Sequence, residues 1–110
     1  MTTEKEMFVC KLKKSIYRLK QASKQWYLKF NDIILSYGFI ENIVDQRIYI
    51  KVNESKFIIL VLYVDDILLA TNDIILLHDV KKFLSNKFEM KDMGEASYVI
   101  GMEIFRERSQ

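Results

Sequence analysis

The stretch FIILVLYVDDILLATND, residues 57–73, decides the fold of this 110-residue chain. It joins two strongly apolar runs, 57–64 and 67–70, through the adjacent carboxylates Asp65 and Asp66. Successive residues of a strand point to opposite faces, so two neighbouring aspartates inside a straight strand would put one carboxylate in the core. The sequence therefore predicts a tight turn at the two aspartates, between two strands. The first of these strands is apolar on both faces and is expected to be central and buried.

Three further segments have the apolar, β-branched and aromatic composition of strands. They are 7–12, 47–52 and 97–105, the last of them after an expected turn at 93–95. The segment 47–52 is followed by turn residues and then by 57–64, which predicts a hairpin.

Apolar residues at helical spacing predict two helices. The first runs from about Ala22 to Tyr37, where Gly38 is expected to end it with Phe39 packed beneath. The second covers 71–88, with Thr71, Asn72 or Asp73 as its cap. Its expected inward side chains are Leu76, Val80, Phe83 and Leu84, and its expected outward ones are His78, Asp79, Lys81, Lys82, Ser85 and Asn86. The fold class is then α+β, an antiparallel sheet packed against two main helices on one face.

Composition narrows the class of protein. Half of the residues are apolar and 29% are charged, which is typical of a globular domain, and the net charge is only +2. Cys10 is the single cysteine, which excludes an internal disulfide and a cysteine-rich metal site. The start of the chain does not resemble a signal peptide, and its longest apolar run is too short to span a bilayer. We expect an intracellular protein without a membrane partner, in the cytoplasm or the nucleus.

The aspartate pair has two interpretations when only its spacing is considered. Asp is a favoured turn residue, so Asp65 and Asp66 are explained by a polar hairpin turn that joins two apolar strands. The same turn would also hold two carboxylates on a rigid platform, and carboxylate oxygens are preferred ligands of hard divalent cations. Spacing alone leaves both interpretations open.

Three blocks of the sequence, in a fixed order along the chain, together resemble a known protein family. They are VCKLKKSIYRLKQASKQWYLKF (9–30), YVDD (63–66) and FEMKDMGEASYVIGMEI (88–104). Together they resemble the palm of the copia-type retrotransposon reverse transcriptases. The resemblance implies an incomplete, palm-like reverse transcriptase domain over 8–108, after an N-terminal tail of residues 1–7. It also implies ancestry in an RNA-directed DNA polymerase, which performs nucleotidyl transfer.

The resemblance implies a role for particular residues. Asp65 and Asp66 match the catalytic pair that binds Mg²⁺ or Mn²⁺. The residues that it places near the nucleotide or the primer–template are Tyr63, Val64, Arg18, Lys20 and Gln21. The basic N-terminal third would meet nucleic-acid phosphates through Lys11, Lys13, Lys14 and Lys24. The implied partners are an RNA template, a DNA primer, a deoxynucleoside triphosphate and other parts of the polyprotein.

Departures from the family pattern change the expected activity. The family's third catalytic aspartate lies in a block upstream of 9–15, and residues 1–8 do not match that block. Arg18 and Ser23 stand where the family has glycine and proline. We therefore expect weak metal binding and a fragment that is inactive alone. Two alternatives stay open: a non-catalytic nucleic-acid-binding or assembly module derived from the palm, and a plain α+β domain with an acidic turn.

Overall fold

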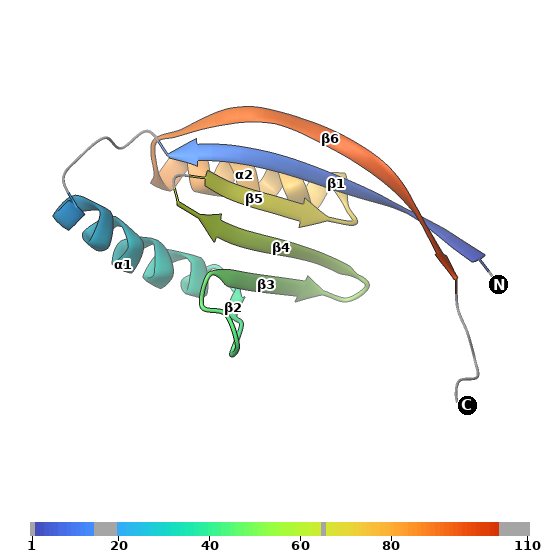
Figure 1. The fold of residues 1–110 in the computed structure, drawn as a ribbon, viewed down its shortest axis with the longest axis horizontal. Coiled ribbons are helices and arrows are strands. Elements are labelled where there is room, and N and C mark those ends of the chain that lie inside the picture. The colour runs from blue at the N-terminus through green and yellow to red at the C-terminus, as the bar shows by residue number, and fades with distance from the viewer. Residues whose placement is uncertain (1, 15–19, 65, 104–110) are drawn as a thin grey trace.

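The computed structural model describes residues 2–14, 20–64 and 66–103 of the chain (Figure 1). The described part contains one antiparallel sheet of six strands and two helices, which confirms the predicted α+β class. The elements in chain order are β1 (Thr2–Lys14), α1 (Lys20–Ser36), β2 (Ile40–Glu41), β3 (Ile48–Asn53), β4 (Lys56–Tyr63), β5 (Asp66–Thr71), α2 (Ile74–Lys87) and β6 (Met90–Glu103).

The strands lie in the order β2-β3-β4-β5-β1-β6, and every neighbouring pair is antiparallel. The strand predicted to be central, β4, pairs with β3 on one side and with β5 on the other. Strand β1 lies between β5 and β6, so the first and last described strands are neighbours (Figure 1). The pairing leaves β2 and β6 at the edges of the sheet.

One face of the sheet carries the core. The register places Tyr49, Leu60, Leu69 and Cys10 side by side across four strands, and all four are buried. Their neighbours along the chain point to the other face and are only partly buried, as the alternating burial of β4 shows. The expectation that β4 is buried on both faces is therefore wrong, because the helices pack against one face only. The other face is called the open face below.

The two helices cover the core face and contact each other through aromatic rings. In Figure 1, α2 lies behind β5 and β1. Phe30 of α1 lies 6.1 Å from Tyr49 of the sheet and 5.5 Å from Phe88 at the end of α2, measured between ring centroids. Tyr37 stacks on Phe83 of α2 with ring centroids 3.9 Å apart. These contacts join both helices and the sheet into one core.

The C-terminal end of α1 and the N-terminal end of α2 have the capping interactions that the sequence predicts. Gly38 has a φ of +108°, and the N–H groups of Gly38 and Phe39 donate to the carbonyls of Leu35 and Ile34, as in a Schellman ending. Phe39 is buried beneath this turn. At the start of α2, the carboxylate of Asp73 accepts the N–H of Leu76, which selects Asp73 among the three candidate caps.

Two details of the sequence prediction are corrected. Strand β1 is much longer than 7–12, because it begins at Thr2 and takes in residues that were placed in a tail. The expected turn at 93–95 is a β-bulge inside β6, where Met93 and Gly94 lie opposite the single residue Lys11. The φ of Gly94 is +114°, which fits a bulge and explains the glycine.

Among the described residues, no helix has the length and apolar character needed to cross a membrane.

Replacing Phe30 by alanine is expected to lower the free energy of unfolding by about 3–5 kcal/mol, since the ring is fully buried among three aromatic neighbours. Urea denaturation followed by circular dichroism measures the loss. Leu28→Ala is the matched control on the same helix, because Leu28 is 54% exposed and should change stability by only about 0.5 kcal/mol. Equal losses in the two variants would contradict this placement of the core.

Candidate functional site

The predicted acidic turn is a two-residue hairpin between β4 and β5. Tyr63 and Asp66 form the last pair of the two strands, so 64–65 is the loop. Val64 has a φ of +54°, in the left-handed region that β-branched residues rarely adopt. A positive φ is what a tight two-residue hairpin needs, although glycine or asparagine usually supplies it. Asp65 lies outside the described residues.

Along β4 and β5, successive side chains point to opposite faces of the sheet, and this alternation determines where the side chains of the hairpin point. Leu62 and Ile67 are buried on the core face. Their neighbours Tyr63 and Asp66 therefore lie on the open face, which the helices leave uncovered. Tyr63 is 60% exposed and Val64 is 78% exposed. The Tyr63 ring and the Asp66 carboxylate thus stand at the end of two strands, on the face without helices, where the ring is largely exposed and the carboxylate is 23% exposed.

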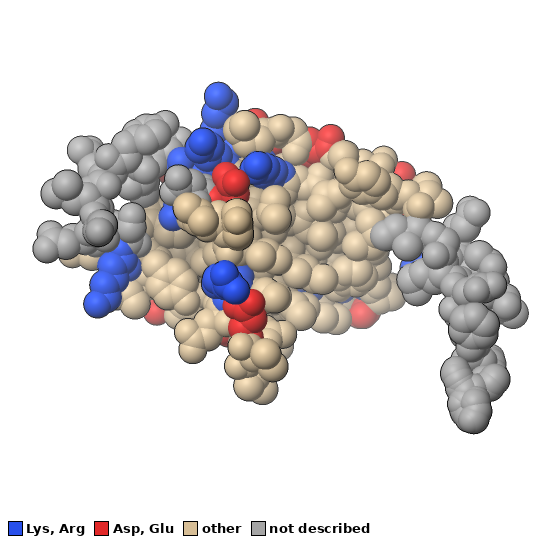
Figure 2. Space-filling model, viewed as in Figure 1, with Lys and Arg blue, Asp and Glu red and all other residues tan. Residues whose placement is uncertain are grey.

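Two of the predicted phosphate-binding lysines lie beside this carboxylate. Lys13 is opposite Asp66 in the register of β1 and β5, and Lys11 lies two residues further along the same face. The Nζ of Lys11 is 3.4 Å from Oδ2 of Asp66. Figure 2 looks on the open face, where charged side chains are sparse in the middle and Lys and Arg gather around an acidic group near the end of β1.

The other predicted residues lie elsewhere or outside the described part. Lys14 points to the core face, where its Nζ lies 4.2 Å from the centroid of the Trp26 ring. Lys24 is an exposed residue of α1. Arg18 lies outside the described residues. Lys20 and Gln21 belong to the first turn of α1, but their side chains are also outside that description. The structure therefore brings Tyr63, Val64, Asp66, Lys11 and Lys13 together.

The described residues of the hairpin do not by themselves fit a divalent cation. Mg²⁺ and Mn²⁺ prefer several oxygen ligands. At this position the described carboxylate is that of Asp66, and one of its oxygens already faces the ammonium of Lys11. Further oxygen ligands from Asp65 or from other segments would be required.

A second cluster, which the sequence analysis missed, lies on the core face between β1, β6 and α2. It consists of Cys10, Asp92 and Glu95, whose ligand atoms lie within 4.8 Å of one another. The ammonium of Lys81 contacts both carboxylates, and the Cys10 thiol donates to Asp92 at 3.6 Å. Lys81 was predicted to point outward, and that prediction is wrong. Because the ammonium of Lys81 pairs with both carboxylates, we interpret the cluster as an ion-pair network that holds β6 against α2.

The pKa values of the cluster follow from these contacts. Hydrogen bonds from Lys81 hold the pKa of Asp92 and of Glu95 below their usual range. Desolvation lowers the pKa of Lys81, but its hydrogen bonds to the two carboxylates outweigh this effect and raise the pKa overall. Burial raises the pKa of the Cys10 thiol to about 11, so this thiol stays protonated near neutral pH. His78 is exposed, as predicted, and its Nε2 lies 3.3 Å from Glu95.

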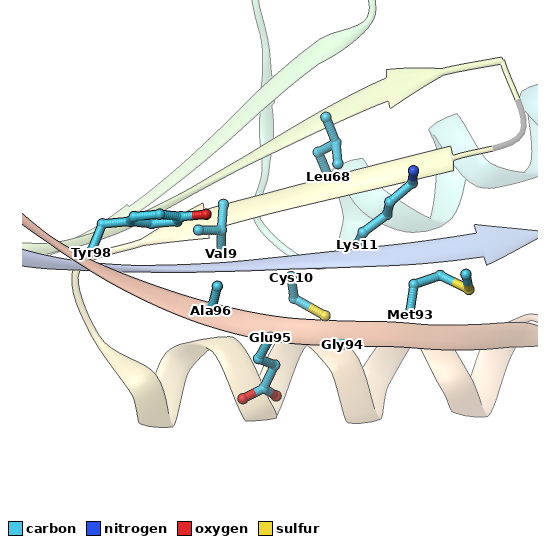
Figure 3. A pocket seen from close by; sticks show the side chains of 9 residues that line it. All are labelled: Val9, Cys10, Lys11, Leu68, Met93, Gly94, Glu95, Ala96 and Tyr98. Carbon is cyan, nitrogen blue, oxygen red and sulfur yellow. The ribbon is translucent and has the colours of Figure 1, made fainter.

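A hollow of about 360 Å³ opens beside Lys11 on the open face (Figure 3). In Figure 3, the side chains of Val9, Lys11 and Leu68 point to the open face of the sheet, whereas Glu95 points toward α2. Tyr98 and Met93 also line the hollow. The described lining of this hollow on the open face is therefore largely apolar, with Lys11 as its one ammonium.

Acidification should destabilise the chain through the second cluster. The lowered pKa values of Asp92 and Glu95 mean that their ion pairs contribute above the unfolded pKa values, near 4, and are lost as the pH falls through the folded values. Lys81→Met should cost about 1 kcal/mol at pH 7 and should flatten the loss between pH 5 and 3. Urea unfolding followed by Trp26 fluorescence measures both. The neighbouring exposed Lys82, changed to Met, is the control, and an equal flattening there would contradict the network.

Comparisons with known proteins agree with the resemblance. The family model described as reverse transcriptase (RNA-dependent DNA polymerase) matches residues 1–110. The retrovirus-related Pol polyprotein from transposon TNT 1-94 of Nicotiana tabacum is 46% identical over 106 residues, which are 96% of this chain and 8% of that protein. The corresponding polyprotein from transposon RE1 of Arabidopsis thaliana is 37% identical over 90% of this chain and 7% of its own length. No solved structure matches.

The chain thus spans less than a tenth of these two curated relatives. The match nevertheless extends along the whole chain and includes the acidic hairpin between β4 and β5 and the bulged strand β6. The predicted resemblance to copia-type elements is confirmed, and the chain belongs to the reverse transcriptase family, as a fragment of a retrotransposon Pol polyprotein.

Proposed function

We propose that residues 8–108 act as a partial palm domain that holds an RNA–DNA hybrid on the open face of its sheet. The observation that carries the proposal is the position of Tyr63 and Asp66 at the end of two buried strands, on the face without helices. A template, a primer and an incoming nucleotide would be the ligands, as the resemblance implies. The hairpin would then face the primer end.

Electrostatics supports this choice of face. Lys11 and Lys13 lie on the open face, where they would meet backbone phosphates. Lys14 is left out of the proposed contact surface, because its ammonium lies over Trp26 on the core face. The apolar middle of the open face has Leu68 and Tyr98, which suit the sugar and base surfaces of a nucleic acid.

Catalysis by these 110 residues alone is not part of the proposal. Reverse transcriptases generally use divalent metal, and Asp65 and Asp66 are the proposed ligands. The described residues at the hairpin do not complete such a site, and residues 1–8 do not match the family's third aspartate block. We propose weak metal binding, with further ligands supplied by other parts of a polyprotein.

A second candidate function is a non-catalytic nucleic-acid-binding or assembly module. The ion pair between Lys11 and Asp66 favours it, because a carboxylate that is already neutralised by a lysine has less attraction for a cation. The two candidate functions share the nucleic-acid contact and differ in whether chemistry occurs. They are therefore separated by activity and not by binding.

Binding to a fluorescent RNA–DNA primer–template should weaken steeply with salt, which anisotropy measures at several salt concentrations. The double variant Lys11→Gln/Lys13→Gln should reduce the slope of log K against log salt by about two, since each lost phosphate contact removes about one unit. Lys82→Gln/Lys87→Gln is the matched control, with the same loss of charge on α2, across the sheet from the open face. Equal slopes in the two double variants would contradict the open face as the contact surface.

A primer-extension assay on an RNA template tests the catalytic part. The purified chain should give no extended product with Mg²⁺ or Mn²⁺, because the reacting groups are held from one side only and misalignment costs about tenfold in rate per 1.4 kcal/mol. Asp65→Asn is run beside it. Product from the unmodified chain that disappears in this variant would show that the two aspartates suffice.

A further inference from the structure

The loop between β2 and β3 carries two aliphatic side chains that point away from the core. Ile43 is 98% exposed and Val44 is 94% exposed, which makes them the two most exposed large apolar residues in the described part of the chain. Figure 1 shows this loop projecting beyond the edge of the sheet. Scattered apolar residues are normal on a protein surface, but two adjacent ones at the tip of a projecting loop form a surface whose burial is favourable.

Hydrogen bonds hold this tip in one shape. The Asn42 side chain accepts the backbone N–H groups of Val44 at 2.8 Å and of Asp45 at 3.0 Å. The Asp45 carboxylate accepts the backbone N–H of Arg47 at 3.0 Å and two N–H groups of its guanidinium at 3.1 Å. Because the loop is already ordered, little conformational entropy is lost when the tip binds to another surface.

A hollow of about 400 Å³ lies beside the tip. Its aliphatic lining is called the β2–β3 patch and consists of Ile40, Ile43, Val44, Ile50 and Val52. Ile40 and Ile50 are opposite each other in the register, and Val52 follows on the same face of β3, the open face. At about 30 Å³ for each carbon, as for a water molecule, the side chains of one isoleucine and one valine occupy roughly 200 Å³. The hollow therefore has room for the tip of another molecule.

We propose that the β2–β3 patch is the interface of a symmetric dimer, in which the tip of each copy enters the hollow of the other. A twofold axis brings the same surface of two subunits together, so that surface has to be complementary to itself. The β2–β3 patch meets this condition because it contains both a projecting apolar tip and an adjoining apolar hollow. The proposal does not rest on the proposed nucleic-acid contact, because Lys11 and Lys13 lie on β1, beyond β4 and β5 in the sheet.

Charge and topology favour a second copy as the occupant of the hollow. The described lining contains a single charged residue, Glu41, and the nearby Asp45 and Arg47 form an ion pair of their own at 3.1 Å. Two patches therefore meet with little like charge between them. The first and last described strands, β1 and β6, lie at the opposite side of the sheet from β2. Segments attached directly to either of them start far from the patch, whereas a second copy brings its own tip.

The area of the patch sets the expected strength of the dimer. Burial of a valine or isoleucine side chain removes roughly 60–120 Å² of apolar surface from water. The members of the patch that are at least 65% exposed are Ile40, Ile43, Val44 and Val52. With the loop backbone and the polar rim, two copies would bury on the order of 1,000 Å², which is the lower limit for a specific interface. We therefore expect a weak dimer, with a Kd on the order of 100 μM.

Sedimentation velocity of the 110-residue chain without nucleic acid, from about 10 μM to about 1 mM, tests the proposal. The unmodified chain should shift from monomer to dimer over this range. Ile43→Ser/Val44→Ser should weaken association by at least about tenfold, since both tips lose their apolar surface. Leu28→Ser/Ile75→Ser is the matched control, because it removes two exposed aliphatic side chains from the helices, and it should associate like the unmodified chain.

Cross-linking tests the arrangement of the two copies. Ile43→Cys in one copy and Val52→Cys in the other should form a disulfide-linked dimer when the two variants are mixed under air oxidation, because the tip meets the hollow. Ile75→Cys mixed with Val52→Cys is the control, and it should give only a background level of this mixed dimer. The native Cys10 is buried and does not take part.

Three results would overturn the proposal, provided that circular dichroism shows each variant to be folded. A chain that stays monomeric at about 1 mM would mean that the patch does not bind a second copy. Equal association of the tip variant and the control variant would place the interface elsewhere. Association that continues beyond a dimer would exclude a closed twofold contact. Because the assay contains no nucleic acid, its failure is independent of the anisotropy assay.

Discussion

The register of the β4–β5 hairpin is the constraint on which the rest of the structure depends. Tyr63 pairs with Asp66, and this pairing sends Leu62 and Ile67 to the core face. A slip of one residue would exchange the two faces of a strand, which would put a carboxylate into the apolar core and leucines into water. The cost of burying an unpaired charge therefore protects the register. The same register keeps Asp66 on the face where a ligand has access.

Local sequence chemistry predicted the parts of the fold that depend on neighbours along the chain. The central strand, the hairpin at the aspartates and the Schellman ending at Gly38 all depend on residues only a few positions apart. The inward position of Lys81 depends instead on Asp92 and Glu95, which belong to a strand that α2 meets only in the folded state. Helical periodicity predicts that such a lysine faces solvent, because its partners Asp92 and Glu95 belong to β6 and not to the helix.

Strand β6 was harder to predict for a related reason. Its described side chains from Lys91 to Val99 are exposed, so the strand lacks the alternation of buried and exposed residues that marks β3, β4 and β5. Its regularity comes from pairing with β1 along almost its whole length. A glycine within a polar stretch predicts a turn, and only the partner strand shows that it is a bulge. The candidate site has the same limit: its residues were named from the sequence, but the ion pair between Lys11 and Asp66 depends on a strand pairing that is distant in sequence.

The pairing of β1 with β6 has a consequence for how the domain joins its neighbours. The register places Thr2 opposite Glu103, and Figure 1 shows both ends of the described chain leaving from the same end of the sheet. Any polypeptide attached before and after this unit would therefore enter and exit side by side. A unit of this kind inserts into a longer chain as a closed loop, without forcing its flanking segments apart. The pairing of the first strand with the last would thus make the domain modular within a longer protein.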